Sequence, residues 1–171
     1  MKYILFSLVG LVAFAGVALA GPQYVDKTGF AASGYDVVAY TGLKQVPVGK
    51  KQINGIPGKS SITANYNGAK WAFSTRENRD KFLANPAKYV PQFNGHCAYG
   101  VSLGGKVPGN PNLWRIVDGK LYFNITRTVV GFWEKDIPGH IKTGGKNWLT
   151  LEPTKASTLK VPELVIKNAP L

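Results

Sequence analysis

The stretch ITANYNGAKWAF, residues 62–73, places an Asn-Gly pair between two short segments in which apolar residues alternate with others. Asn-Gly accepts the positive φ values of a two-residue turn between twisted strands, so it predicts a β-hairpin. The expected pairing sets Ala64 opposite Trp71 and Ile62 opposite Phe73. One face of this hairpin is therefore apolar and needs to be covered.

A second hairpin is predicted around Asp118-Gly119, because this dipeptide favours the same type of turn. In this hairpin Ile116 faces Leu121, and Trp114 faces Phe123. Two hairpins that are each apolar on one face require a common layer to pack against.

Predicted helices supply that layer. The sequence STRENRDKFLANP, residues 74–86, begins with Ser74 and Glu77 in the capping-box arrangement, and Asn85-Pro86 starts a short second helix that runs to Tyr89. We expect the fold class to be α+β, a single small domain of β-hairpins packed against short helices. The predicted core comprises Trp71, Phe73, Phe82, Trp114, Phe123 and Trp133.

A further amphipathic helix is predicted from about Thr126, because Val129, Trp133 and Ile137 recur every four residues. Pro138-Gly139 is expected to break it. Residues 43–61, rich in Lys, Gly and Pro, are predicted to form a long surface loop. Inspection of the sequence finds no internal repeat.

The beginning of the chain has the features of a signal peptide. Lys2 precedes an apolar run that ends in Ala-Leu-Ala at residues 18–20, a pattern that predicts cleavage before Gly21. We therefore expect a signal peptide at 1–20, an N-terminal lead-in at 21–33, a domain at 34–148 and a C-terminal tail at 149–171. The tail is expected to be extended or disordered and to dock through residues 163–166 as an edge strand. The predicted localisation is periplasmic or secreted, with no transmembrane segment after cleavage.

The chain is strongly basic, with 21 Lys and Arg against 9 Asp and Glu. Cleavage would remove Lys2 and reduce the net charge from +12 to +11. For an exported protein this excess favours an acidic protein partner or an anionic envelope surface, and nucleic acid is not expected. The lysines form no continuous block.

Five ordered segments resemble the exported bacterial YHS-domain family: residues 34–40, 66–74, 78–93, 95–102 and 114–124. The resemblance covers residues 34–148 and implies a YHS-like scaffold, and it links the protein to metal-associated relatives. Those relatives carry two cysteines at the positions of Ser74 and Asn78. The Tyr-His-Ser element itself reads Trp-Ala-Phe-Ser at residues 71–74, so the metal-binding mode of those relatives does not transfer to this chain.

Cys97 is the only cysteine, and it directly follows His96 in the segment PQFNGHCAYGVS, residues 91–102. Thiolate and imidazole ligands suit copper or zinc, and His140 is a candidate third ligand. In a second interpretation Cys97 is a buried hydrophobic residue. In a third it is a reactive thiol with redox or sulfur-carrying activity.

The sequence thus leaves two main functional hypotheses. The preferred one is an exported YHS-domain binding protein, metal-associated through Cys97 with His96 and His140, that binds Cu or Zn and is not an enzyme. The alternative is a non-enzymatic protein-interaction or accessory module, in which Cys97 is structural and a basic surface binds an acidic partner.

Overall fold

The computed structural model describes residues 21–162 and residue 164. The predicted signal peptide, residues 1–20, lies outside the described residues, and so does the predicted edge strand at 163–166 apart from Leu164. Within the described part of the chain, no helix is long and apolar enough to cross a membrane.

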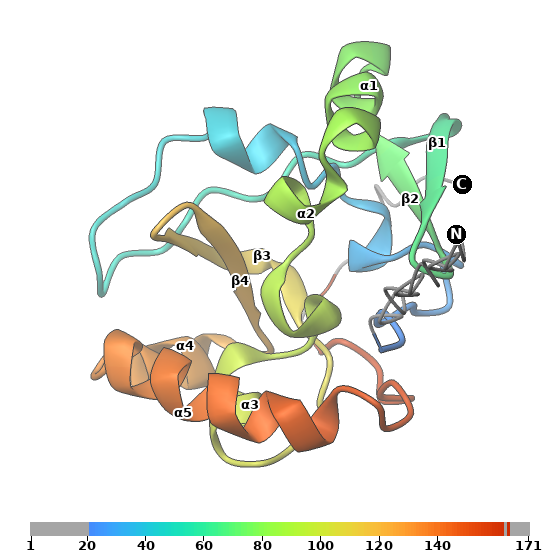
Figure 1. Ribbon diagram of the computed structural model, residues 1–171. Coiled ribbons are helices and arrows are strands. Elements are labelled where there is room, and N and C mark those ends of the chain that lie inside the picture. The colour runs from blue at the N-terminus through green and yellow to red at the C-terminus, as the bar shows by residue number, and fades with distance from the viewer. Residues whose placement is uncertain (1–20, 163, 165–171) are drawn as a thin grey trace, which may run out of the picture.

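The architecture confirms the predicted α+β class: two separate two-stranded antiparallel sheets are combined with short helices (Figure 1). The first sheet pairs β1 (Lys59–Tyr66) with β2 (Ala69–Phe73), and α1 (Arg76–Ala84) and α2 (Pro86–Tyr89) follow it. The second sheet pairs β3 (Asn110–Val117) with β4 (Lys120–Asn124).

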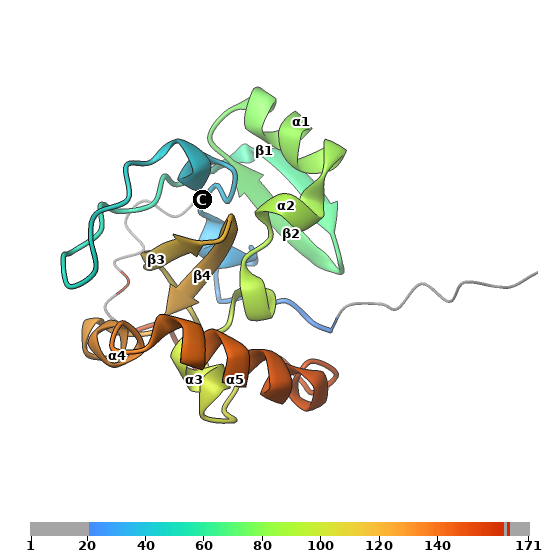
Figure 2. The ribbon, with the colours of Figure 1, turned by 60° about the vertical axis from the view of Figure 1, so that its left-hand side comes forward.

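Three further helices cover the end of the molecule opposite α1. They are α3 (Ala98–Ser102), α4 (Arg127–Trp133) and α5 (Ile137–Leu151). Figures 1 and 2 both show this helical group at one end, the first hairpin with α1 at the other, and β3 and β4 between them. Short 3₁₀ turns at Ala32–Gly34, Ala39–Gly42 and Gln92–Gly95 complete the fold.

Both hairpins turn at the predicted dipeptides. Asn67 and Asp118 have φ values of 49° and 50°, as this turn type requires. The predicted pairs in the second hairpin are confirmed, and so is Ala64 opposite Trp71. The prediction that Ile62 faces Phe73 is wrong, because a bulge shifts the register and places Phe73 opposite Lys59.

The helix boundaries differ from the prediction at two places. The cap of α1 is Thr75, whose side chain accepts a hydrogen bond from the Asn78 N–H at 3.1 Å, and Ser74 is instead bonded to Asp36. Pro138 does not break a helix but occupies the first turn of α5, where its missing N–H has no intrahelical partner to lose. Asp136 caps that helix.

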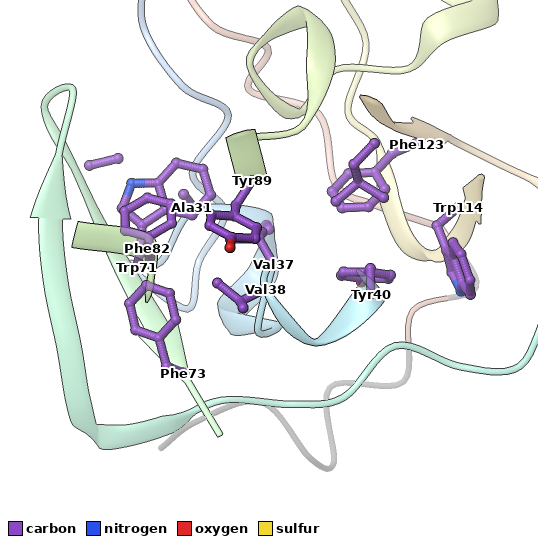
Figure 3. Packing of buried hydrophobic residues seen from close by; sticks show 13 residues of the cluster. Ala31, Val37, Val38, Tyr40, Trp71, Phe73, Phe82, Tyr89, Trp114 and Phe123 are labelled. Carbon is purple, nitrogen blue, oxygen red and sulfur yellow. The ribbon is translucent and has the colours of Figure 1, made fainter. Parts of the chain in front are cut away.

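Two clusters of buried hydrophobic residues form the core. The larger cluster contains five of the six predicted residues and joins both hairpins; Figure 3 shows Phe82 and Trp71 together on one side and Tyr40, Phe123 and Trp114 on the other. Trp133 is the exception to the prediction, since it packs with Phe93 and Tyr122 in the second cluster. α4 and α5 therefore have a core of their own.

The structure contains a repeat that the sequence does not reveal. Thr75 follows the Asn67-Gly68 turn at the same spacing as Thr126 follows Asp118-Gly119, and each threonine caps the next helix. The same correspondence continues along both helices. It relates Phe82 to Trp133, both fully buried, and the N-caps Asn85 and Asp136.

The repeat extends upstream of each hairpin. The turn at Ala32–Gly34 and residues 93–95 each contain three successive residues with positive φ and end in glycine. The Gly58 N–H then donates to the Gly34 carbonyl at 2.8 Å, and the Gly109 N–H donates to the Gly95 carbonyl at 3.0 Å. Each half thus consists of a left-handed turn, a hairpin and a capped pair of helices.

The two ends of the described chain meet on one side of the domain. The Gly21 N–H donates to the Glu152 carboxylate at 3.2 Å, and the Asn94 side chain donates to the Gly21 carbonyl at 2.8 Å. The Lys106 ammonium donates to three carbonyl groups at the end of α5 and just after it. They belong to Leu151, Glu152 and Thr154. The predicted tail is therefore helical at its start, and its continuation is attached to the domain.

Candidate functional site

Cys97 is completely buried at the N-terminus of α3. Its thiol donates to Asn124 Oδ1 at 3.5 Å, and Sγ accepts from the Gly100 N–H at 3.4 Å. Burial raises the pKa of the thiol, and the N–H groups of Gly100, Ile125 and Tyr99 oppose this only in part. These surroundings keep the group a neutral thiol at pH 7, the form that is neither a strong nucleophile nor a metal ligand.

His96 is buried as well, and both of its ring nitrogens have hydrogen-bond partners. Nδ1 lies 2.9 Å from the Phe93 carbonyl, so it must carry the proton, and Nε2 accepts from the Ser157 N–H at 3.1 Å. Burial lowers the pKa of His96 to about 4; the Phe93 carbonyl opposes this shift and the charge of Lys106 adds to it. Neither nitrogen has a free lone pair in this arrangement.

His140 lies on α5, where its Nδ1 is 3.1 Å from the Ser102 hydroxyl of α3. Its ring also contacts the edge of Tyr99, with the ring centres 5.0 Å apart. The structure packs Cys97, His96 and His140 around α3, but the hydrogen bonds of the described residues do not join any two of these side chains.

Among the described residues, no group of three or more His, Cys, Asp and Glu side chains is arranged to hold a metal ion. The association of Cu or Zn with Cys97, His96 and His140 therefore remains a prediction from the sequence. The structure gives these three residues structural contacts that account for their positions.

Asp36 is a polar centre that the sequence analysis did not identify. It is fully buried, and its Oδ1 accepts from the N–H groups of Val38 and Ala39 at 3.0 and 3.2 Å. Its Oδ2 accepts from the Ser74 hydroxyl at 2.6 Å and from the Asn78 side chain at 2.8 Å. Ser74 and Asn78 thus meet at one buried carboxylate.

Asp36 and Cys97 occupy equivalent places in the two halves of the domain. The Asp36 N–H donates to the Ile56 carbonyl at 2.8 Å, and the Cys97 N–H donates to the Val107 carbonyl at 2.9 Å. Each side chain accepts an N–H at the start of a short helical turn. The comparison supports a structural role for Cys97, because Asp36 performs the same capping task with a carboxylate.

A cavity lies between the surface loop, β3 and α4. Its volume is about 280 Å³. It is lined by Gly49, Lys50, Lys51, Gln52, Asn112, Leu113, Trp114, Arg115, Asn124, Arg127, Val130, Gly131, Trp133 and Glu134. The predicted loop therefore forms one wall of a cavity, and this role was not foreseen.

A buried ion pair fixes that wall. Arg115 and Glu134 both line the cavity and form a salt bridge, and each side chain is 7% exposed. The other Glu134 oxygen accepts from the Gly49 N–H at 2.8 Å, and Arg115 also donates to the Val46 carbonyl at 3.2 Å. The loop is thus attached to β3 and to the end of α4 through charged groups that are already paired.

Two features of the cavity lining lack partners. Lys50, Lys51 and Arg127 are exposed cations that take part in none of the salt bridges among residues 21–162. In addition, the indole N–H of Trp133 is buried and has no hydrogen-bond acceptor among the described residues. A buried donor without a partner costs about 1 to 3 kcal/mol, so an acceptor supplied from outside would be favoured here.

Asn124 connects the cavity with the surroundings of Cys97. Its Oδ1 accepts from the Cys97 thiol and from the Tyr99 N–H at 3.1 Å, while the side chain also lines the cavity. Sequence analysis did not select Asn124, because a single Asn at the end of a strand carries no motif.

Comparison with protein-family models, with curated proteins and with solved structures finds no match for this chain. The resemblance to the YHS-domain family therefore remains a prediction that rests on the sequence segments quoted above.

Proposed function

We propose that this protein is a non-enzymatic binding module that recognises an acidic partner through the cationic rim of the cavity, formed by Lys50, Lys51 and Arg127. The observation that carries the proposal is the asymmetry of charge at this cavity. Its one acidic side chain, Glu134, is already paired with Arg115, whereas the three rim cations have no ion-pair partner in the described part of the chain.

The surroundings of Cys97 support this proposal over chemistry at the thiol. A neutral thiol with a raised pKa, bonded to Asn124 and capping α3, has a sufficient structural role. His96, the nearest imidazole in sequence, uses both ring nitrogens within the fold. These contacts support a binding surface at the cavity rim over one at Cys97.

The proposal is tested with a fluorescein-labelled deca-glutamate peptide as the acidic probe, with binding measured by fluorescence anisotropy. The triple variant Lys50→Glu, Lys51→Glu, Arg127→Glu should bind at least tenfold more weakly than the unaltered protein. Binding to the unaltered protein should also weaken as salt is added, because ion contacts between exposed groups are screened.

The matched control carries Lys59→Glu, Lys142→Glu and Arg76→Glu, which change the net charge equally at exposed positions away from the cavity. It should bind within about threefold of the unaltered protein, since charges beyond a Debye length of about 8 Å contribute little at physiological salt. Equal losses in both triple variants would mean that only the overall charge matters, and the proposal would fail.

A further inference from the structure

We infer that the cavity is a site for one small organic carboxylate with an apolar body, in which the carboxylate meets the cationic rim and the body enters the cavity. This inference rests on the proposed function in using the same three rim cations. It goes further by naming the chemical class of small ligand that the cavity selects.

The size and lining of the cavity favour such a ligand. A volume of about 280 Å³ lies at the lower limit of small-molecule sites, which begin at about 300 Å³. It therefore suits a body of roughly one ring, not a cofactor. Leu113, Val130 and Trp133 provide apolar lining, and a purely inorganic anion would leave this surface without a contact.

The polar groups of the cavity point to an acceptor on the ligand. Trp71 and Trp114, which are buried like Trp133, donate their indole N–H groups to backbone carbonyls at 3.1 and 2.8 Å. Trp133 alone of these three lacks an acceptor. Its Nε1 is buried next to the cavity that Trp133 lines, so a ligand oxygen reaches it after a local side-chain shift that leaves the loop wall in place.

Asn124 is a further polar residue of the cavity lining. Its Oδ1 is occupied by the Cys97 thiol and the Tyr99 N–H, which leaves the Nδ2 hydrogens as the part of the side chain that can serve a ligand. Three cations that are unpaired among the described residues line the cavity, and its only carboxylate is neutralised by Arg115. This combination favours an anion with hydrogen-bond acceptors.

The loop wall of the cavity is held in place by hydrogen bonds within the protein. Gln52 closes the loop by accepting from the Val46 N–H at 3.0 Å and donating to the Val46 carbonyl at 3.3 Å, and Trp114 holds the Ile53 carbonyl. A preformed wall does not have to be ordered on binding, and this reduces the entropic cost of binding a small ligand.

The experiment uses the ¹⁵N-labelled protein and phenylacetate as the probe, and it follows the indole N–H signals by NMR. The Trp133 signal is assigned through Trp133→Phe. We expect a saturable downfield shift of that signal, because its proton gains an acceptor. Phenylacetamide, which lacks the charge, and acetate, which lacks the apolar body, should each bind at least tenfold more weakly.

Variants separate this site from general attraction of anions. Arg127→Gln should weaken phenylacetate binding at least fivefold, whereas the exposed control Lys142→Gln on α5 should leave it unchanged. If Trp133→Phe disturbs the fold, Arg127→Gln still decides the question, since Arg127 is exposed. Equal affinity for phenylacetate and phenylacetamide, or no saturable shift of the Trp133 signal, overturns the inference.

The two proposals fail separately. Deca-glutamate binding that depends on the rim, without a phenylacetate site, would retain the proposed function and remove this inference. A phenylacetate site without rim-dependent binding of deca-glutamate would support the carboxylate site and remove the acidic-partner function.

Discussion

His96 shows how a single residue depends on segments far from it in sequence. Its Nδ1–H is directed to Phe93, three residues before it, while its Nε2 is bound by Ser157, from the segment that follows α5. The neutral ring fits this site because the imidazolium ion would have two donors, and the second donor would face the Ser157 N–H. Protonation therefore breaks a contact that ties the C-terminal segment to the domain.

A pH dependence of stability follows. The pKa of His96 in the folded protein is about 4, below the ordinary value of about 6.5. The unfolded chain therefore binds the proton first. Stability should be at its full value above about pH 6.5 and should fall as the pH is lowered toward 4, by up to about 3 kcal/mol. Urea unfolding at pH 7.5 and at pH 4.5 measures the difference.

Two histidine variants test the assignment of this effect. His96→Gln should remove most of the loss in unfolding free energy between pH 7.5 and 4.5, because no imidazole is then forced to stay neutral. His140→Gln serves as the matched control and should retain the loss. If both variants keep the full pH dependence of the unaltered protein, His96 is not its source.

At this scale, the sequence indicated which residues are chemically unusual but not their surroundings. Cys97 and His96 stand out by residue type, yet their contacts come from Asn124 and Ser157, which carry no motif. Asp36, by contrast, does not stand out in the sequence. Its role becomes visible only in the fold, which brings Ser74 and Asn78 to its carboxylate.

The elements of secondary structure were more predictable, because turns and caps depend on local sequence. Asn-Gly and Asp-Gly determine both hairpin turns through their own backbone preferences, independently of how the hairpins pack. The N-cap of α1 was predicted at Ser74 but lies one residue later, at Thr75. The reason is a long-range contact, because the buried Asp36 binds Ser74. The repeat was not detected because its two halves share turns, caps and glycines, whereas their core residues differ in type.

Gly58 and Gly109 are equivalent glycines where each hairpin passes the preceding turn. A Cβ on Gly109 would lie 2.6 Å from the Gly95 carbonyl oxygen. A Cβ on Gly58 would lie 2.5 Å from the carbonyl carbon of Ala72. Both Gly58→Ala and Gly109→Ala should therefore destabilise the protein by about 3 kcal/mol, at the upper end of typical overpacking costs. Thermal unfolding monitored by circular dichroism measures the effect.

Gly145→Ala provides the matched control in α5. No atom lies within 4 Å of a Cβ at this position, and Ala is the better helix former, so this variant should gain roughly 0.5 to 1 kcal/mol. Gly109→Ala and Gly58→Ala proteins that melt at the temperature of the unaltered protein would show that these close approaches are not tight.

On the scale of the whole molecule, the segment after α5 joins parts of the domain that are remote in sequence. The Ser157 N–H binds His96, the Leu159 carbonyl accepts from Tyr24 at 2.8 Å, and the Pro162 carbonyl accepts from Asn110 at 3.3 Å. The predicted boundary at residue 149 described this segment as a tail, because its sequence has no periodicity. Its order comes from hydrogen bonds to its backbone, which leave no sequence pattern.

Truncation after Lys155 tests this role. The loss of three hydrogen bonds at about 1 kcal/mol each should reduce the unfolding free energy by roughly 3 kcal/mol. It should also weaken the pH dependence below 6.5, because His96 would be opened to water. Urea unfolding of the truncated and full chains at both pH values measures the two effects. A truncated chain of unchanged stability would mean that the segment only lies on the surface.

The contact between Gly21 and Glu152 has a consequence for protein maturation. If the chain is cut before Gly21, as the sequence predicts, the donor at Glu152 changes from a peptide N–H to a positively charged α-amino group. The hydrogen bond then becomes an ion pair between the first residue and the end of α5. A side chain at position 21 would place its Cβ 2.0 Å from the Glu152 carbonyl oxygen. Cleavage would therefore release an N-terminus that already fits its site beside Glu152. The new ion pair would make the cleaved protein more stable than the uncleaved one.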